Sequence, residues 1–171
     1  LRQPIEDGVV TVARSGDTIR FPARFQLVAA TNPCPCGFLR DRRQPCVCSE
    51  ARLGRYRQRL SGPLIDRFDI RITVPRLRSD DLRGAAGEPS SAVRDRVRRA
   101  RALQATRTRL NRELSGAELD DLPVAPAAHR LLTGVFDQGA VTGRGWDRVR
   151  RVARTIADLD GGGDITENHM A

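Results

Sequence analysis

The order of apolar and polar residues predicts a β-hairpin near the start of the chain. Apolar side chains alternate with small or polar ones on both sides of a Ser-Gly-Asp turn at 15–17, which is the pattern of two short strands. We therefore expect a hairpin over residues 8–25. Arg14 and Arg20 flank its turn, either as solvated charges or as a basic finger that follows a phosphate backbone.

Two other segments are candidate strands. Residues 25–31 form a nearly continuous apolar run that ends at Asn32-Pro33, and residues 70–74 form a second candidate strand that ends at Pro75. The first run has no alternation, which suits a strand buried on both faces, as in the parallel sheet of an α/β fold. Since such folds keep their chemistry at the carboxyl ends of their strands, Asn32 is a candidate functional residue. We expect this α/β part, with its parallel strands and hairpin, to cover residues 1–78.

Beyond a linker at 79–91, which is rich in Gly, Pro, Ser and Asp, the pattern predicts a small all-α domain over 92–171. Apolar residues there recur at helical spacing. Ser49 also predicts the N-cap of a short helix that carries Leu53, Tyr56 and Leu60 on its apolar side and ends near Gly62-Pro63, between the two candidate strands. The other expected helices lie at about 91–113, 126–138 and 142–159, with the start of one more within 164–171. Pro126 suits the first turn of the second of these, and the third starts with Thr142. Their expected buried side chains are Val93, Val97, Leu103 and Leu110; Leu131, Leu132, Val135 and Phe136; and Trp146, Val149, Val152, Ala153, Ile156 and Leu159.

Charge changes this picture, because all 30 basic residues are arginine and the chain has no lysine. A lysine Schiff base and a complete Walker A loop are therefore excluded from these 171 residues. The net charge of +9 favours a polyanionic partner such as nucleic acid, although the codon usage of a GC-rich genome explains an arginine-only inventory equally well. No apolar run approaches the roughly 18 residues of a membrane span, and no signal peptide is visible, so we expect a soluble cytoplasmic protein.

The four cysteines predict a metal site. Cys34, Cys36, Cys46 and Cys48 form two C-x-C pairs on either side of a short loop. Four thiolates meet the tetrahedral demand of structural zinc. Because C-x-x-C pairs are commoner than C-x-C pairs, disulfides and free thiols stay open as alternatives, and the cytoplasm disfavours disulfides.

Two arginines stand out by their position. Arg67 lies between two aspartates ahead of the second candidate strand, either as an ion pair at a helix end or as a cation presented to a neighbouring subunit's phosphate. Arg144 lies in the first turn of a predicted helix, where a cation opposes the helix dipole unless an anion binds there; an exposed surface arginine is the alternative. Neither His129 nor His169 has a catalytic partner nearby in the sequence.

Three stretches of the chain resemble one family. These stretches strongly resemble Mg-chelatase-like AAA+ ATPases of the ComM/YifB type, and the resemblance extends over nearly the whole chain. The cysteine loop after Asn32 is similar to this branch and is not expected in magnesium chelatase itself. The matching stretches are residues 21–37, 60–69 and 144–159.

The resemblance implies roles for single residues. Asn32 matches the sensor 1 residue, which orients the attacking water, and Arg67 matches the arginine finger, which acts on ATP in the adjacent protomer. Arg144 matches the sensor 2 arginine of the helical lid. The hairpin resembles one that grips DNA in the pore of related ring motors, with Arg14 and Arg20 as the candidate contacts. The implied cofactors are ATP and Mg²⁺.

The implied function is that of a hexameric ring ATPase that moves DNA, as in branch migration during recombination. One alternative is a chelatase-like or chaperone-like ATPase that remodels a protein partner, and another is a zinc-stapled nucleic-acid-binding module. In the family, Walker A and Walker B lie upstream of the segment matched here. We therefore expect this chain, which starts at Leu1 without a Met, to be an excerpt that neither binds ATP tightly nor hydrolyses it alone.

Overall fold

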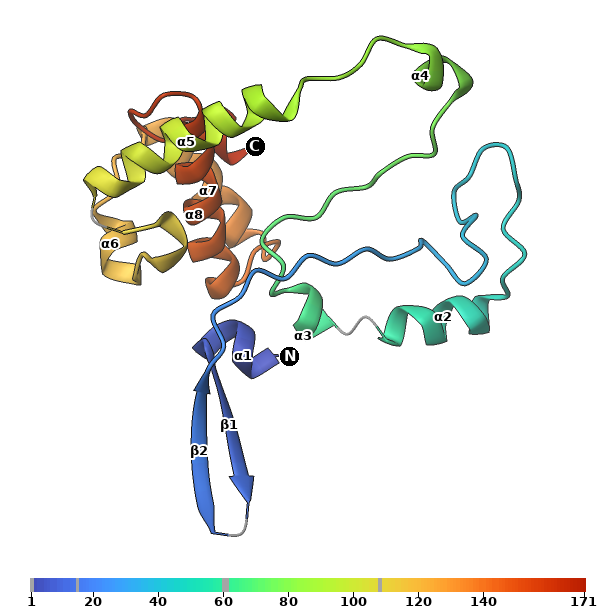
Figure 1. Cartoon of the computed structure of the whole chain (residues 1–171), viewed down its shortest axis with the longest axis horizontal. Helices are drawn as coiled ribbons and strands as arrows, with labels where there is room; N and C mark the ends of the chain where they lie inside the picture. The colour runs from blue at the N-terminus through green and yellow to red at the C-terminus, as the bar shows by residue number, and fades with distance from the viewer. Residues whose placement is uncertain (1, 15, 60–61, 108) are drawn as a thin grey trace. The chain divides into compact units, whose positions relative to one another are not determined.

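The computed structural model describes residues 2–14, 16–59, 62–107 and 109–171 (Figure 1). The chain forms two compact units, residues 1–68 and 69–171, and each is described here by itself. None of the described helices is both long and apolar enough to span a bilayer.

The first unit is built around the hairpin. The expected hairpin is confirmed, with Val9 opposite Pro22 and Arg14 opposite Asp17. Gly8 connects the hairpin to a preceding helix, and its φ of 63° favours glycine because it lies in the left-handed region. The elements of this unit are α1 (Arg2–Asp7), β1 (Val9–Arg14), β2 (Asp17–Pro22), α2 (Glu50–Arg59) and α3 (Gly62–Ile65).

The two faces of the hairpin differ in character. Directly paired residues lie on the same face of an antiparallel ladder, and successive residues alternate between faces. The pairs Val10–Phe21 and Val12–Ile19 therefore make one face apolar. About half of the surface of Phe21 and Ile19 remains exposed within this chain.

The predicted parallel strands do not form among the described residues. Segments 25–31 and 70–74 carry no strand, and Val28 and Ile72 are 83% and 80% exposed. A strand is stabilised by hydrogen bonds to a neighbouring strand, and β1 and β2 pair only with each other. The described part of the chain supplies no partner for either segment, so the parallel sheet is not shown here, and the sheet that does form is the two-stranded antiparallel hairpin.

Helix α2 begins where its cap predicts. The Ser49 hydroxyl accepts a hydrogen bond from the Arg52 backbone N–H at 3.4 Å, and Leu53, one turn into the helix, is buried. A Ser at this position satisfies one of the free N–H groups of the first turn. The predicted apolar residue Leu60 lies outside the described residues.

The second unit is helical, as the spacing predicts. The linker contains a short helix, and the helix expected at 91–113 ends earlier, at Thr106, where the chain turns to bring Asn111 into the core. The other two expected helices are confirmed to within one residue. The elements are α4 (Ser79–Arg83), α5 (Ser90–Thr106), η1 (Asn111–Glu113), α6 (Gly116–Asp120), α7 (Pro126–Asp137), α8 (Gly143–Leu159) and α9 (Glu167–Met170).

Helix α8 is the centre of this unit and packs against α5, α6, α9 and η1. Ala153 and Ala157 of α8 pack with Ile165, whose backbone bonds to Pro123 and Ala125. Small side chains let the helices approach closely, in keeping with the scarcity of aromatic residues. Some expected core residues are half-exposed instead, because the buried stripe lies slightly to one side of them: Val93, Val97, Leu131, Phe136 and Ile156.

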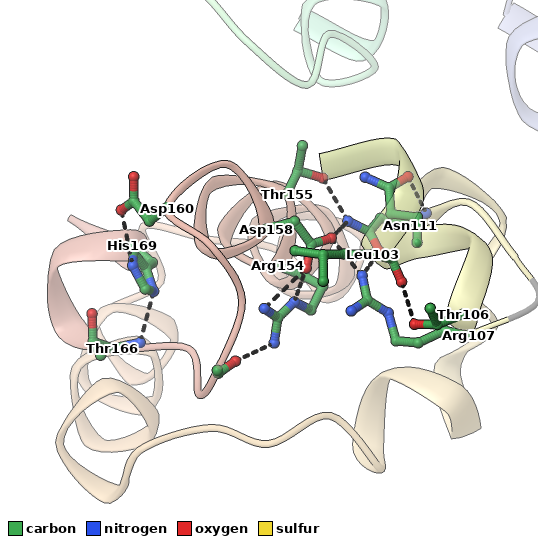
Figure 2. A network of polar contacts seen from close by, with 12 residues as sticks. Leu103, Thr106, Arg107, Asn111, Arg154, Thr155, Asp158, Asp160, Thr166 and His169 are labelled. Atoms are coloured by element: carbon green, nitrogen blue, oxygen red, sulfur yellow. Dashed lines mark hydrogen bonds and ion pairs between the residues drawn. The ribbon is translucent and has the colours of Figure 1, made fainter. Parts of the chain in front are cut away.

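A buried polar network, which we call the Asp158 cluster (Asp158, Arg154, Arg107, Asn111 and Thr155), completes this core (Figure 2). Asp158 accepts hydrogen bonds from Arg107, from Asn111 Nδ2 at 2.8 Å and from Arg154 Nε at 3.1 Å. Its side chain is fully buried. Buried charges are tolerated only when they are paired and hydrogen-bonded, and this carboxylate meets both conditions.

The end of α8 is fixed by the same cluster. Arg154 Nη1 donates to the carbonyl oxygen of Gly163 at 2.7 Å. Gly161, Gly162 and Gly163 all have φ between 87° and 107° and reverse the chain after the helix. The arginine therefore joins the helix to the turn that follows it.

Candidate metal centre and arginine sites

The structure brings the four cysteines together. Their Sγ atoms all lie within 4.8 Å of one another, and the three described Sγ–Sγ separations are 3.3, 3.7 and 3.6 Å. A tetrahedral zinc with Zn–S bonds of about 2.3 Å has S–S edges of about 3.8 Å. All four cysteines are free thiols, so the disulfide alternative is not realised. The arrangement fits one mononuclear ion.

Two local turns bring the cysteine pairs to one place. Gly37, with a φ of 84°, closes the first turn by donating its N–H to the carbonyl oxygen of Cys34 at 3.0 Å. The Asp41 carboxylate closes the second by accepting from the backbone N–H groups of Arg43 and Gln44. Asx turns of this kind reverse the chain without a hydrophobic core. Cys34 is nevertheless fully buried.

The pKa values of the four thiols are shifted in opposite directions, lowered for Cys34 and Cys36 and raised for Cys46 and Cys48. The backbone N–H of Phe38 lowers the pKa of Cys36 to about 6. The backbone N–H of Cys48 lowers the pKa of Cys46, but desolvation and the neighbouring sulfur atoms outweigh it and raise the pKa to about 12. Like charges this close oppose each other's ionisation, and a divalent cation removes that opposition. The donor set therefore fits a metal.

The backbone of Asn32 is held by the only tyrosine of the chain. Tyr56 Oη on α2 donates to the Asn32 carbonyl oxygen at 2.9 Å and lies 2.9 Å from Thr31 Oγ1. Asn32 itself is exposed and precedes Cys34 by two residues. Sequence reasoning missed Tyr56, which it assigned to the apolar side of α2.

Arg67 forms an ion pair. Its Nη2 lies 2.7 Å from Glu6 Oε1, with the two side chains 12% and 33% exposed. The Arg67 backbone N–H donates to the carbonyl oxygen of Leu64, so the arginine lies in the turn that follows α3. Sequence reasoning missed Glu6, because 61 residues separate the partners and no local pattern connects them.

Arg144 lies on the surface of the second unit, in the first turn of α8. The Thr142 hydroxyl caps this turn by accepting from the Gly145 N–H at 3.1 Å. Gly145 is required here, since a Cβ at this position would lie 2.7 Å from a methyl group of Val141. The cap and the glycine together fix the backbone that carries Arg144.

Arg14 and Arg20 are both exposed on the hairpin, and they lie on opposite faces. Arg14 pairs with Asp17 and shares the apolar face, whereas Arg20 pairs with Thr11 on the other face. The structure therefore does not combine them into a single patch on one face.

Sequence reasoning also missed the Asp158 cluster, because arginine is seldom buried. A signal was present: Arg154 and Asp158 are four residues apart, and each directly follows a core alanine of α8. Polar residues at helical spacing within an apolar stripe indicate a buried pair.

Comparison with known proteins matches both halves of the chain. Residues 1–82 match the family model described as magnesium chelatase, subunit ChlI, and residues 87–171 match the one described as magnesium chelatase, subunit ChlI C-terminal. Competence protein ComM of Haemophilus influenzae is 38% identical over 100% of this chain and 34% of that protein. The uncharacterized protein YifB of Escherichia coli is 37% identical over 99% of this chain and 34% of that protein.

An uncharacterized protein of Mycobacterium tuberculosis is 44% identical over 94% of this chain and 33% of that protein. The chain therefore spans about a third of the length of the curated relatives that it matches.

Proposed function

Because the chain belongs to the magnesium chelatase ChlI family, in its ComM- and YifB-like branch, we propose that it is the second half of an AAA+ ATPase core followed by its helical lid. In this proposal the working protein is a hexameric ring that hydrolyses Mg-ATP at its subunit interfaces. Since the chain has no lysine, the Walker A lysine of such a site is not among these 171 residues.

The observation that carries the proposal is the environment of Arg67. Its guanidinium is largely buried and fixed by Glu6, so it is a positioned cation and not a mobile surface charge. In this proposal another anion takes the place of Glu6, which is one-third exposed, beside Arg67. A phosphate of ATP bound to the adjacent protomer is the anion proposed here. A fixed cation of this kind stabilises the charge of the transferring phosphoryl group.

Two other residues complete the proposed chemistry. The Asn32 side chain orients the attacking water, and Arg144 contacts the nucleotide from the lid, which couples the position of the lid to the nucleotide state. Bound ATP and Mg²⁺ supply the phosphoryl group and the charge neutralisation of its transfer. In this proposal Arg67 stabilises the charge of the transferring phosphoryl group, and Asn32 orients the attacking water. Arg144 couples the position of the lid to the nucleotide state.

The exposed apolar segments support the same assignment. Val28 and Ile72 lie in runs that suit buried strands, yet they are almost fully exposed within this chain. In the complete core we expect segments 25–31 and 70–74 to become parallel strands by pairing with strands from outside these residues. Asn32 would then lie at the carboxyl end of a strand, where α/β folds bind ligands.

For the substrate of the motor, we propose DNA. The net charge of +9 and the exposed hairpin arginines support a polyanion. The alternative is a protein partner, and the half-exposed apolar face of the hairpin favours it.

The cysteine cluster is proposed to hold a structural zinc ion. The tetrahedral Sγ separations and the four-thiol donor set support zinc over a larger metal cluster, and no open ligand position is left for catalysis. Zinc would supply the cohesion that this polar loop lacks.

The test of the motor is made in a protein that joins this chain to a core with Walker A and Walker B. Arg67→Ala should abolish ATP hydrolysis and leave ATP binding within about twofold, since the finger acts in the transition state. Arg57→Ala, an exposed arginine on α2, is the matched control. Rings mixed from Arg67→Ala subunits and Walker-A-defective subunits should regain activity, because each then completes the other's site. Hydrolysis by Arg67→Ala alone would refute the finger.

DNA binding is tested on the chain itself by anisotropy of a labelled duplex over a range of salt concentrations. Each phosphate contact contributes about one unit to the log–log salt slope. Arg14→Ala and Arg20→Ala should each lower the slope by about one, with Arg57→Ala again as control. Unchanged binding in both variants would favour the protein partner.

A further inference from the structure

The position of Asn32 has no obvious support in its own segment. Residues 23–49 form no helix or strand, and within the first unit only Cys34 and Leu53 are classed as buried among the described residues. Without a neighbouring strand or a packed core, an exposed asparagine samples many orientations, each fixed residue costing about 1–2 kcal/mol of backbone entropy. Something else must hold it if it is to orient a water molecule.

One hydrogen bond and one short chain connection restrain Asn32. On one side, Tyr56 donates to its carbonyl oxygen at 2.9 Å. On the other side, Cys34 follows by two residues and lies fully buried among the other thiols, 3.3 Å from Cys36 and 3.7 Å from Cys46. Asn32 is thus held between α2 and the cysteine cluster.

The tyrosine hydroxyl contacts two groups. A phenol carries one hydrogen, and Tyr56 donates it to the Asn32 carbonyl oxygen. The Thr31 hydroxyl lies 2.9 Å from the Tyr56 oxygen and also donates to the Asn32 carbonyl oxygen at 3.3 Å. Tyr56 therefore fixes the Asn32 backbone, and a phenylalanine would not.

The cysteine cluster lies within the chain loop that the hydrogen bond between Tyr56 and Asn32 closes. The chain leaves Asn32, passes all four cysteines, and enters α2 through Ser49, the residue directly after Cys48; Tyr56 then returns to Asn32. A metal that joins the two cysteine pairs shortens the flexible loop between Asn32 and Tyr56. The Tyr56 hydrogen bond then costs less loop-closure entropy. Leu53, one turn before Tyr56, is buried and anchors the same side of α2.

We propose that metal bound by the four cysteines, acting with Tyr56, sets the position of Asn32, so that Tyr56 is a positioning residue for the water-orienting amide. This inference rests on the zinc and ATPase proposals above. Metal loss or removal of the Tyr56 hydroxyl should slow the chemical step and spare nucleotide affinity, because neither group contacts the nucleotide.

The first experiment uses the 171-residue chain labelled with ¹⁵N-asparagine, stripped of metal and titrated with Zn²⁺. The labelled residues are Asn32 in the first unit and Asn111 and Asn168 in the second, which serve as internal controls. One equivalent of zinc should shift the Asn32 amide signal and raise its heteronuclear NOE toward that of the buried Asn111. The signals of Asn111 and Asn168 should not move.

Variants separate the two anchors. Tyr56→Phe should still take up one zinc, but the rise in the Asn32 NOE should be lost. Cys46→Ser should weaken zinc uptake and leave Asn32 mobile at any zinc concentration. Zinc uptake with an unchanged Asn32 signal would overturn the link and leave the zinc site standing. Failure of the wild-type chain to bind zinc would overturn both.

The second experiment uses the joined motor with Walker A and Walker B. Tyr56→Phe should lower kcat about tenfold or more and change KM for ATP less than twofold, since small misplacements of a reacting group are costly. Arg57→Ala, the neighbouring exposed residue, should change neither. An unaffected kcat in Tyr56→Phe, alongside loss of hydrolysis in Arg67→Ala, would overturn the positioning role and leave the ATPase proposal intact.

Discussion

The two units of this chain are stabilised by different kinds of contact. In residues 69–171, helices pack around α8 and bury apolar side chains together with a paired charge cluster. In residues 1–68, the described buried residues are Cys34 and Leu53, and order comes from a hairpin, two tight turns and a group of thiols. One unit is held by packing between helices, whereas the other has little buried apolar surface among its described residues.

The difference does not follow from the number of aromatic residues. Five of the seven aromatic residues lie in the first unit and two in the second: Phe21, Phe25, Phe38, Tyr56 and Phe68, and then Phe136 and Trp146. The buried residues of the second unit are mainly alanines, leucines and the Arg154–Asp158 pair. In the first unit the described buried residues are one cysteine and one leucine. The comparison predicts that the two units respond to different perturbations.

Removal of metal should have the largest effect, and it should be confined to the first unit. Structural zinc contributes about 10–16 kcal/mol of apparent binding free energy, most of which is folding free energy in small domains. A chelator should therefore make the 31–56 region sensitive to protease while the far-UV helical signal of α5, α7 and α8 persists. Equal loss of both units on chelation would show that they are not independently held.

Asp158→Ala should have the largest effect of any substitution in the second unit. Arg154, whose side chain is 2% exposed, would then lie buried without its carboxylate. Breaking a buried ion pair from one side costs about 3–5 kcal/mol. Asp160→Ala, two residues on and exposed beside His169, is the control and should cost less than about 1 kcal/mol. Urea unfolding measures both, and similar losses would remove the cluster's special role.

Leu132→Ala tests the apolar part of the same core. Leu132 is 4% exposed and its neighbour Leu131 is 38% exposed, so the pair forms a matched test of burial on α7. Truncating the buried leucine should cost about 2–5 kcal/mol, and truncating the other less than about 1 kcal/mol. The free energy of unfolding of the two variants is compared by urea denaturation. A larger loss of stability in Leu131→Ala than in Leu132→Ala would mean that α7 is rotated about its axis in solution.

Ser115→Ala should have the smallest effect, about 1 kcal/mol, because it removes the N-cap of α6. The Ser115 hydroxyl is also the main cause of the lowered pKa of Glu118, to which it donates at 2.7 Å. Since the pKa of Glu118 is lower in the folded state than in the unfolded chain, its stabilisation is present at neutral pH and is lost as the pH falls through the folded value. A pH series of melting temperatures should show this loss in the wild type and a weaker one in Ser115→Ala.

Local pattern predicted much of this fold. The alternation around residues 15–17, the caps at Ser49 and Thr142, and the proline at the start of α7 each depend on neighbours within a few residues, and each element formed close to its expected bounds. Segments 25–31 and 70–74 form no strand among the described residues. Strand pairing depends on a second strand, which can be distant in sequence, and local pattern carries no information about it.

The sites divide in the same way. The cysteine cluster was predictable because two C-x-C pairs separated by a short loop can meet through local turns. Glu6 and Tyr56 were not, because their partners Arg67 and Asn32 lie 61 and 24 residues away. The buried role of Arg154 was missed because arginine is so seldom buried that its spacing to Asp158 was overlooked.

The three-glycine turn after α8 should tolerate substitution poorly during evolution. Each of its residues has a φ that costs a residue with a side chain about 1–2 kcal/mol, and any single-base change that replaces a glycine introduces such a residue. The turn also supplies the carbonyl oxygen that Arg154 binds, so its backbone cannot relax without disturbing a buried charge. Descendants of this sequence should therefore vary freely along the exposed arginines of α5 while retaining Gly161, Gly162 and Gly163.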